Sequence, residues 1–181
     1  MTDAFGEDDV LANPTIKKLR AFSRRDDPTN REIMRNMAAL IVARNDRWCG
    51  ILGGTIVERT LEGVLKRRMV NLNSSEETEM FGPRGIVSTF GAKAAVAYAM
   101  GVITKKTRRN IDCLREIRNA FAHSFVPIYF STKEVKDAVN LLWLSPDAGK
   151  WITGKSTLKK HYVQAVISTV DAIRQGDAPQ P

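Results

Sequence analysis

The chain has 181 residues, of which 43% are hydrophobic, and its 28 basic and 20 acidic side chains give a net charge of +8. The apolar content excludes a largely disordered chain, and the length suits one globular domain with a buried core. The longest stretch without a charged side chain, residues 119–132, is shorter than the roughly 20 apolar residues that span a bilayer, so we expect no membrane helix.

The first residues of the chain are acidic. Residues 1–10 hold four acidic side chains and no basic one, so residues 11–181 hold 28 basic and 16 acidic side chains, a net charge of +12. An acidic start does not fit a signal peptide, which begins with positive charge. We expect residues 1–13 to form a flexible leader, residues 14–176 one helical domain, and residues 177–181 a frayed tail.

Two helices are predicted in the first half of the chain. Thr29 and Glu32 form a capping box, which opens the first helix. Asn45 can cap the second, in which apolar residues recur at helical spacing as far as about Met69. Three glycines lie inside this long helix and leave room for the close approach of a neighbouring helix: Gly50, Gly53 and Gly54.

The middle of the chain is predicted as a loop followed by two helices. Residues 71–87 are rich in Asn, Ser, Gly and Pro, which favours a loop. Ser88 can cap an alanine-rich helix that ends at Gly101, and Thr104 can cap the next helix. The apolar residues of that next helix form one stripe: Ile111, Leu114, Ile117 and Phe121.

Two further helices complete the prediction. A second capping box, Ser131 with Glu134, opens a helix that runs to about Leu144. The last helix is expected over residues 156–175, stopped by Gly176. Because no segment alternates at period two for long, we predict an all-α fold, a single-domain helical bundle of six to seven helices.

The helix that Thr104 opens begins with a cluster of basic residues. Positive charge in a first turn opposes the helix dipole, which indicates a function for that charge outside the helix. A basic surface favours nucleic acid or another polyanion, and a merely solvated helix surface is the alternative interpretation. The candidate nucleic-acid-binding residues are Lys105, Lys106, Arg108, Arg109 and Arg115.

The same helix carries a group of residues with catalytic potential. Asn119 and His123 are four residues apart and share a face of a regular helix, whereas Arg118 and His123 do not. If the helix loosens near His123, the three side chains converge in a set that suits RNA cleavage without metal. The His would move a proton and the Arg would stabilise charge on phosphate. Alternatively, a His at a helix C-terminus only complements the dipole.

Arg118-Asn119-x-x-x-His123 resembles the R-polar-x-x-x-H motif of the HEPN superfamily. The resemblance implies a helical bundle, often dimeric, in a superfamily that includes metal-independent endoribonucleases and non-catalytic relatives. In active members the Arg and His of two subunits meet in a cleft at the dimer interface. By this resemblance, Arg118, Asn119 and His123 are the candidate catalytic residues.

A longer resemblance, over about residues 30–175, is to the mannitol-operon repressor (MtlR) family. It is carried by the long helix at 48–69, the Gly82-Pro83-x-Gly85 loop, the segments 98–103 and 114–123, and the final helix around 162–173. That family is all-α and named for transcriptional repression, yet it lacks a recognisable helix-turn-helix. The resemblance therefore implies regulation through partners.

Other candidate sites are weaker. Glu58 and Glu62 lie one turn apart and could form a paired acid site, but a solvated surface with Glu62 facing Lys66 is the preferred interpretation. Trp143 and Trp151 flank a proline-containing loop, where packing is preferred over base stacking.

Metal, disulfide and cofactor chemistry are not expected. The two cysteines, Cys49 and Cys113, stand alone, and the two histidines come without a carboxylate cluster. We expect a cytoplasmic, helical regulatory or binding protein, a homodimer, that acts through a protein partner or an RNA or DNA polyanion. The alternative is a HEPN-type metal-independent endoribonuclease that uses Arg118 and His123.

Overall fold

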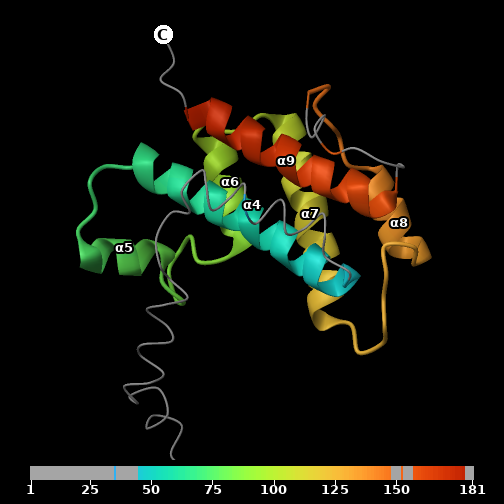
Figure 1. The fold of residues 1–181 in the computed structure, drawn as a ribbon. Helices are drawn as coiled ribbons and strands as arrows, with labels where there is room; N and C mark the ends of the chain where they lie inside the picture. Colours follow the sequence, from blue (N-terminus) through green and yellow to red (C-terminus); the bar gives the residue numbers. More distant parts are fainter. Residues whose placement is uncertain (1–34, 36–44, 148–151, 153–156, 178–181) are drawn as a thin grey trace, which may run out of the picture.

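The computed structural model describes residues 35, 45–147, 152 and 157–177. Within these residues the structure has six helices with defined bounds and no strand, which confirms the predicted all-α bundle (Figure 1). None of these helices is long and apolar enough to cross a membrane. The helices are α4 (Asp46–Arg68), α5 (Ser74–Phe81), α6 (Phe90–Ala99), α7 (Lys105–His123), α8 (Lys133–Asn140) and α9 (Leu158–Asp177).

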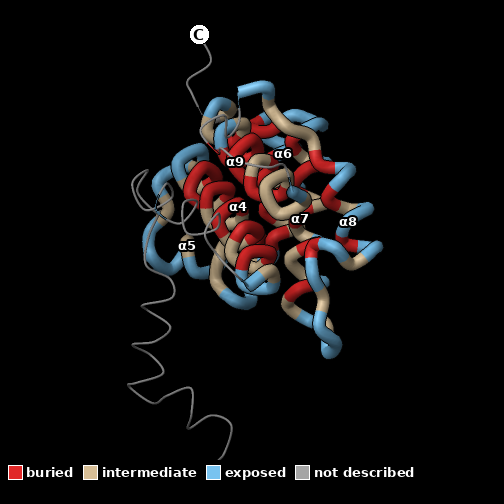
Figure 2. Tube along the Cα trace, turned by 45° about the vertical axis from the view of Figure 1, so that its right-hand side comes forward, coloured by how far each residue is buried: buried red, intermediate tan, exposed pale blue. Residues whose placement is uncertain are grey.

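The long helix α4 packs against α6, α7 and α9, and buried positions concentrate where it meets α7 and α9 (Figure 2). Its glycines explain this closeness. A Cβ at Gly53 would lie 2.6 Å from the hydroxyl oxygen of Tyr162 on α9, and a Cβ at Gly50 would overlap the Phe121 ring on α7. The Tyr162 hydroxyl donates a hydrogen bond to the Gly50 carbonyl at 2.7 Å. The close approach predicted from these glycines is confirmed.

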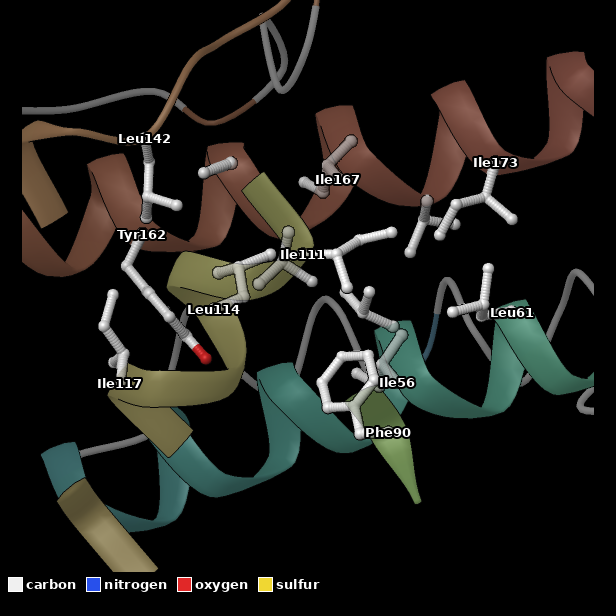
Figure 3. Close-up of a cluster of buried hydrophobic side chains, with 14 of the residues drawn as sticks. Ile56, Leu61, Phe90, Ile111, Leu114, Ile117, Leu142, Tyr162, Ile167 and Ile173 are labelled. Atoms are coloured by element: carbon white, nitrogen blue, oxygen red, sulfur yellow. The ribbon is translucent and has the colours of Figure 1, made fainter. Parts of the chain in front are cut away.

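The predicted apolar stripe of α7 forms the centre of the core. Figure 3 shows its isoleucine and leucine side chains meeting residues of α4 and α9, among them Ile56 and Ile167. The predicted cap is also present, because the Thr104 hydroxyl accepts a hydrogen bond from the Thr107 amide at 3.2 Å. The residues of the stripe, Ile111, Leu114, Ile117 and Phe121, are all buried.

The loop predicted at 71–87 is wrong, because it contains α5. Asn73 caps this helix by accepting from the Ser75 and Glu76 amides, and the Glu76 carboxylate accepts from the Asn73 amide at 2.8 Å. This reciprocal cap stabilises the first turn of an otherwise polar helix. α5 has no buried residue and lies at the edge of the bundle (Figure 1).

Several predicted caps and ends differ from the structure. Thr89, not Ser88, caps α6. The capping box predicted for Ser131 and Glu134 is absent, because α8 begins one residue later than it requires and its N-cap residue, Thr132, makes no capping hydrogen bond. α8 ends at Asn140 rather than near Leu144.

At other boundaries the prediction is partly met or lies beyond the described residues. Gly101 follows α6 with a φ of 70°, as expected of a glycine that ends a helix. Gly176 does not stop the last helix, and Asp177 belongs to α9 rather than to a frayed tail. The leader at 1–13, the helix opened by Thr29 and Glu32, and residues 178–181 lie outside the described residues.

Candidate functional site

A pocket of about 600 Å³ lies between α5 and the rest of the bundle. Side chains from α4, α5 and α6 line it, together with the segment between α5 and α6 and one residue of α7. Its charged lining residues are Glu58, Arg59, Glu62, Lys66, Glu77, Lys93 and Arg118. The structure therefore gathers charges from four helices around one hollow.

Lys93 of α6 is at the centre of this charge arrangement. Its side chain is only 6% exposed, and its Nζ lies 3.0 Å from Glu58 Oε1 and 2.9 Å from Glu62 Oε2, both on α4. The second oxygen of Glu58 accepts a hydrogen bond from Arg118 Nη2 of α7 at 2.9 Å. A buried ammonium is thus paired with two carboxylates, as burial of a charge requires.

The pairing continues from α4 to α5. Lys66 Nζ lies 3.2 Å from Glu62 Oε1 and is also paired with Glu77 of α5. The same ammonium lies 5.3 Å from the centre of the Phe81 ring, so two residues of α5 contact it. We call this alternating row of six residues the charged ladder: Arg118, Glu58, Lys93, Glu62, Lys66 and Glu77.

The ladder shifts the pKa values of its members. Burial opposes ionisation of Glu62, but the hydrogen bonds and charges of Lys93 and Lys66 outweigh it and hold the Glu62 pKa below its usual value. Burial also opposes the charge on Lys66, yet Glu77 and Glu62 raise its pKa above the usual value. Both groups are therefore held in their charged forms at neutral pH.

The interpretation of Glu58 and Glu62 as solvated is wrong, although the predicted pair of Glu62 with Lys66 is present. Both carboxylates are only 16% exposed, because Lys93 of α6 pairs with both and Arg118 of α7 pairs with Glu58. The partner that sequence reasoning missed is Lys93. One signal was available, since Lys93 is the one charged residue in the alanine-rich helix α6.

The structure brings Arg118 and Asn119 together but gives His123 a different environment. Arg118 Nη1 donates to Asn119 Oδ1 at 3.0 Å, and Arg118 lines the pocket as the first residue of the ladder. His123 is exposed and is the last residue of α7. The helix is regular up to that residue, and five residues of a regular helix turn Arg118 and His123 roughly 140° apart. The loosening of the helix on which convergence within one chain depended is absent.

The basic residues at the start of α7 divide into paired and unpaired groups. Arg108 Nε lies 3.0 Å from Asp112, and Arg115 Nη2 lies 2.7 Å from Glu116. Within the described part of the chain, Lys105 and Arg109 are exposed and make no ion pair. We call Lys105, Lys106, Arg108 and Arg109 the basic turn.

Trp143 is half-buried and lies beside the basic turn, while Trp151 lies outside the described residues. Lys106 Nζ lies 3.7 Å from the centre of the Trp143 ring. The Trp143 backbone is fixed by Asn110 of α7, which bonds both its amide and its carbonyl. The turn therefore combines exposed cations with an aromatic ring held at one place.

Metal and thiol chemistry find no support among the residues that the structure describes. No three His, Cys, Asp or Glu side chains there are grouped closely enough to hold a metal ion. Burial raises the pKa of Cys49 to about 12, so its thiol is protonated at neutral pH and a poor nucleophile. Burial raises the pKa of Cys113 as well, with a contribution from Glu116.

Comparisons of the chain with protein-family models, with curated proteins and with solved structures found no match.

Proposed function

We propose that this chain is a helical regulatory or binding protein that acts through a polyanionic partner, RNA or DNA, at the basic turn of α7. The observation that carries the proposal is the exposure of Lys105 and Arg109 without carboxylate partners among the described residues. Unpaired cations at a helix N-terminus are unfavourable for the helix itself, because the dipole already places positive charge there. A polyanion would relieve that repulsion.

Trp143 adds to this surface. An aromatic ring beside cations offers a face on which a nucleic-acid base can stack while phosphates contact the lysine and arginine side chains. The resemblance to the mannitol-operon repressor family supports a regulatory role for such binding. A cytoplasmic location and a homodimeric state belong to the same proposal, and sedimentation of the purified chain tests the dimer.

The test is binding of fluorescently labelled RNA and duplex DNA, measured by anisotropy at two salt concentrations. We expect the double variant Lys105→Gln with Arg109→Gln to lose at least about tenfold in affinity at low salt and to reduce the salt dependence by about two phosphate contacts. The matched control is Lys133→Gln with Lys136→Gln, which removes two exposed cations from the start of α8. Equal losses in both double variants would contradict a specific role for the basic turn.

A second candidate function, the metal-independent endoribonuclease, is favoured by the accessibility of its candidate residues. Arg118 is partly exposed, Asn119 contacts it, and His123 is freely accessible at the end of the same helix. As the HEPN resemblance implies, His123 of one subunit would then meet Arg118 of the other at a dimer interface. Incubation with varied RNAs in the presence of EDTA tests it: we expect cleavage that His123→Ala abolishes, and intact RNA throughout would contradict the enzyme.

A further inference from the structure

We propose that the pocket beneath α5 binds a small hydroxylated anion, meaning a phosphate or carboxylate that also carries hydroxyl groups. The pocket is lined by other residues than the basic turn, so the inference goes beyond the function proposed above. A volume of about 600 Å³ is typical of small-molecule pockets. Among its lining residues only Phe81 and Pro83 have wholly apolar side chains, which favours a ligand with polar groups.

Arg118 is the contact for the anionic group. A guanidinium has five N–H donors, and the structure shows one donating to Glu58 and one to Asn119. The side chain is 28% exposed and lines the pocket, so its remaining donors are available to a ligand there. Their planar fork matches the oxygens of a carboxylate or phosphate.

The start of α6 adds to the same preference. Ser88 and Thr89, which precede the helix, line the pocket together with Arg118. The first turn of α6 has no acidic residue, so the positive end of its dipole is not offset by a carboxylate of its own. Two features therefore favour an anion beside Arg118: the positive charge of its guanidinium and the N-terminal end of the α6 dipole.

Other lining groups accept hydrogen bonds and so suit ligand hydroxyls. The Thr55 hydroxyl donates to the Ile51 carbonyl at 2.9 Å, and the Thr78 hydroxyl donates to the Ser74 carbonyl at 2.8 Å. Because each hydrogen is already used, the hydroxyl oxygens of these two lining residues keep only their capacity to accept. The Glu77 carboxylate on α5 is a further acceptor.

The charged ladder limits how much negative charge the ligand can carry. Its three carboxylates and three cations balance, and Arg59 is the one further charged residue of the lining, so the wall carries a net charge of only +1 and attracts a highly charged anion weakly. Glu58, Glu62 and Glu77 would repel a di- or triphosphate that filled the pocket. A ligand with one anionic group placed at Arg118 avoids this repulsion.

Direct binding measurements with simple probes test the proposal. Isothermal titration compares glycerol 3-phosphate and glycerate, the phosphate and carboxylate forms of the ligand class, with inorganic phosphate and glycerol alone. We expect at least one hydroxylated anion to bind saturably and at least about tenfold more tightly than inorganic phosphate, with no binding of glycerol. Failure of both hydroxylated anions to bind below about 10 mM, or equal binding of inorganic phosphate, would overturn the proposal.

Substitutions at and away from the pocket test whether the probe binds there. Arg118→Lys keeps a positive charge beside Glu58 but loses the planar fork, so we expect it to weaken binding at least about tenfold without unfolding the chain. Arg84→Lys is the matched control on an exposed residue that does not line the pocket. The basic-turn double variant should bind the probe normally, which separates this site from the proposed nucleic-acid surface. Equal binding by Arg118→Lys and Arg84→Lys would contradict the assignment of Arg118.

Protection of α5 gives a second readout. Four residues of α5 line the pocket: Ser74, Glu77, Thr78 and Phe81. Because this helix has no buried residue, the backbone amides of residues 74–81 should exchange hydrogen rapidly in the free protein. A probe bound beneath them should slow their hydrogen exchange. Unchanged exchange at saturating probe would contradict binding in this pocket.

Discussion

α7 carries positive charge in two places, and the surroundings of the two sets differ. Arg118 is built into the charged ladder, with Glu58 and Asn119 as partners. Lys105 and Arg109 of the basic turn are exposed and find no carboxylate in the described part of the chain. Removing one partner of a partly buried ion pair destabilises the fold, whereas exposed charge in the first turn of a helix opposes the dipole and calls for a reason outside the helix. Substitutions should therefore have opposite consequences in the two regions.

The largest effect is expected from removing the central cation of the ladder. Lys93→Met leaves Glu58 and Glu62 facing each other with their shared buried partner gone, and we expect it to lower the free energy of unfolding by about 3 kcal/mol. Urea unfolding measures the change. Lys136→Met, at an exposed position on α8, is the control and should shift stability by less than about 0.5 kcal/mol. Equal stability of the two variants would mean that the ladder contributes nothing to the fold.

The ladder should also make stability depend on pH. The Glu62 pKa is lowered from 4.5, so its contribution is present above that value and is lost as the pH falls through the lower pKa of the folded state. The Lys66 pKa is raised from 10.5, so its contribution is present below that value and is lost at higher pH. We expect the stability difference between wild type and Glu62→Gln to be constant at neutral pH and to shrink on acidification. A difference that does not change between pH 7 and strong acid would contradict the pairing.

The sequence predicted what neighbouring residues determine. The caps at Asn45 and Thr104 and the stripe through Leu114 are local patterns, and the structure has them. The ladder could not be predicted in this way, because Glu58 meets Lys93 and Arg118 from 35 and 60 residues away. Tertiary packing brings these charges together, and periodicity along one helix carries no signal for it.

α5 was missed for a different reason. Its residues are mostly polar, so no apolar periodicity predicts a helix, and the Asn, Ser, Gly and Pro residues of this segment favour a loop. What stabilises it is the reciprocal cap with Glu76 and the contacts of Glu77 and Phe81 with Lys66. The cap is a local pattern in which side chains bond backbone amides, so the sequence carries a signal for it, whereas the contacts with Lys66 depend on tertiary packing. The candidate site, which α5 borders, was therefore not predictable as a pocket.

A smaller effect is expected where the ladder reaches α5. Glu77→Gln removes one partner of Lys66, and because the Glu77 side chain is 44% exposed we expect a change in global stability of less than about 1 kcal/mol. The local effect should be clearer, with faster hydrogen exchange at residues 74–81. Glu79→Gln makes the same chemical change at an exposed position of the same helix and should leave that exchange unchanged. Equal exchange in both variants would show that Lys66 does not hold α5.

The smallest effect on stability, and one of opposite sign, is expected at the basic turn. Removing Lys105 from the first turn of α7 relieves repulsion with the helix dipole, and Arg109, one turn further on, adds little to it, so Lys105→Gln with Arg109→Gln should leave the free energy of unfolding unchanged or raise it by up to about 1 kcal/mol. Thermal or urea unfolding measures this on the same samples used for RNA and DNA binding. The control Lys133→Gln with Lys136→Gln also removes cations from a helix start, so it should be similarly neutral for stability but should keep binding. If this double variant unfolds with a higher free energy but binds RNA or DNA more weakly, the charge of the basic turn serves a partner rather than the fold. A fall in stability instead would place these residues, like Arg118, among the charges that hold the fold.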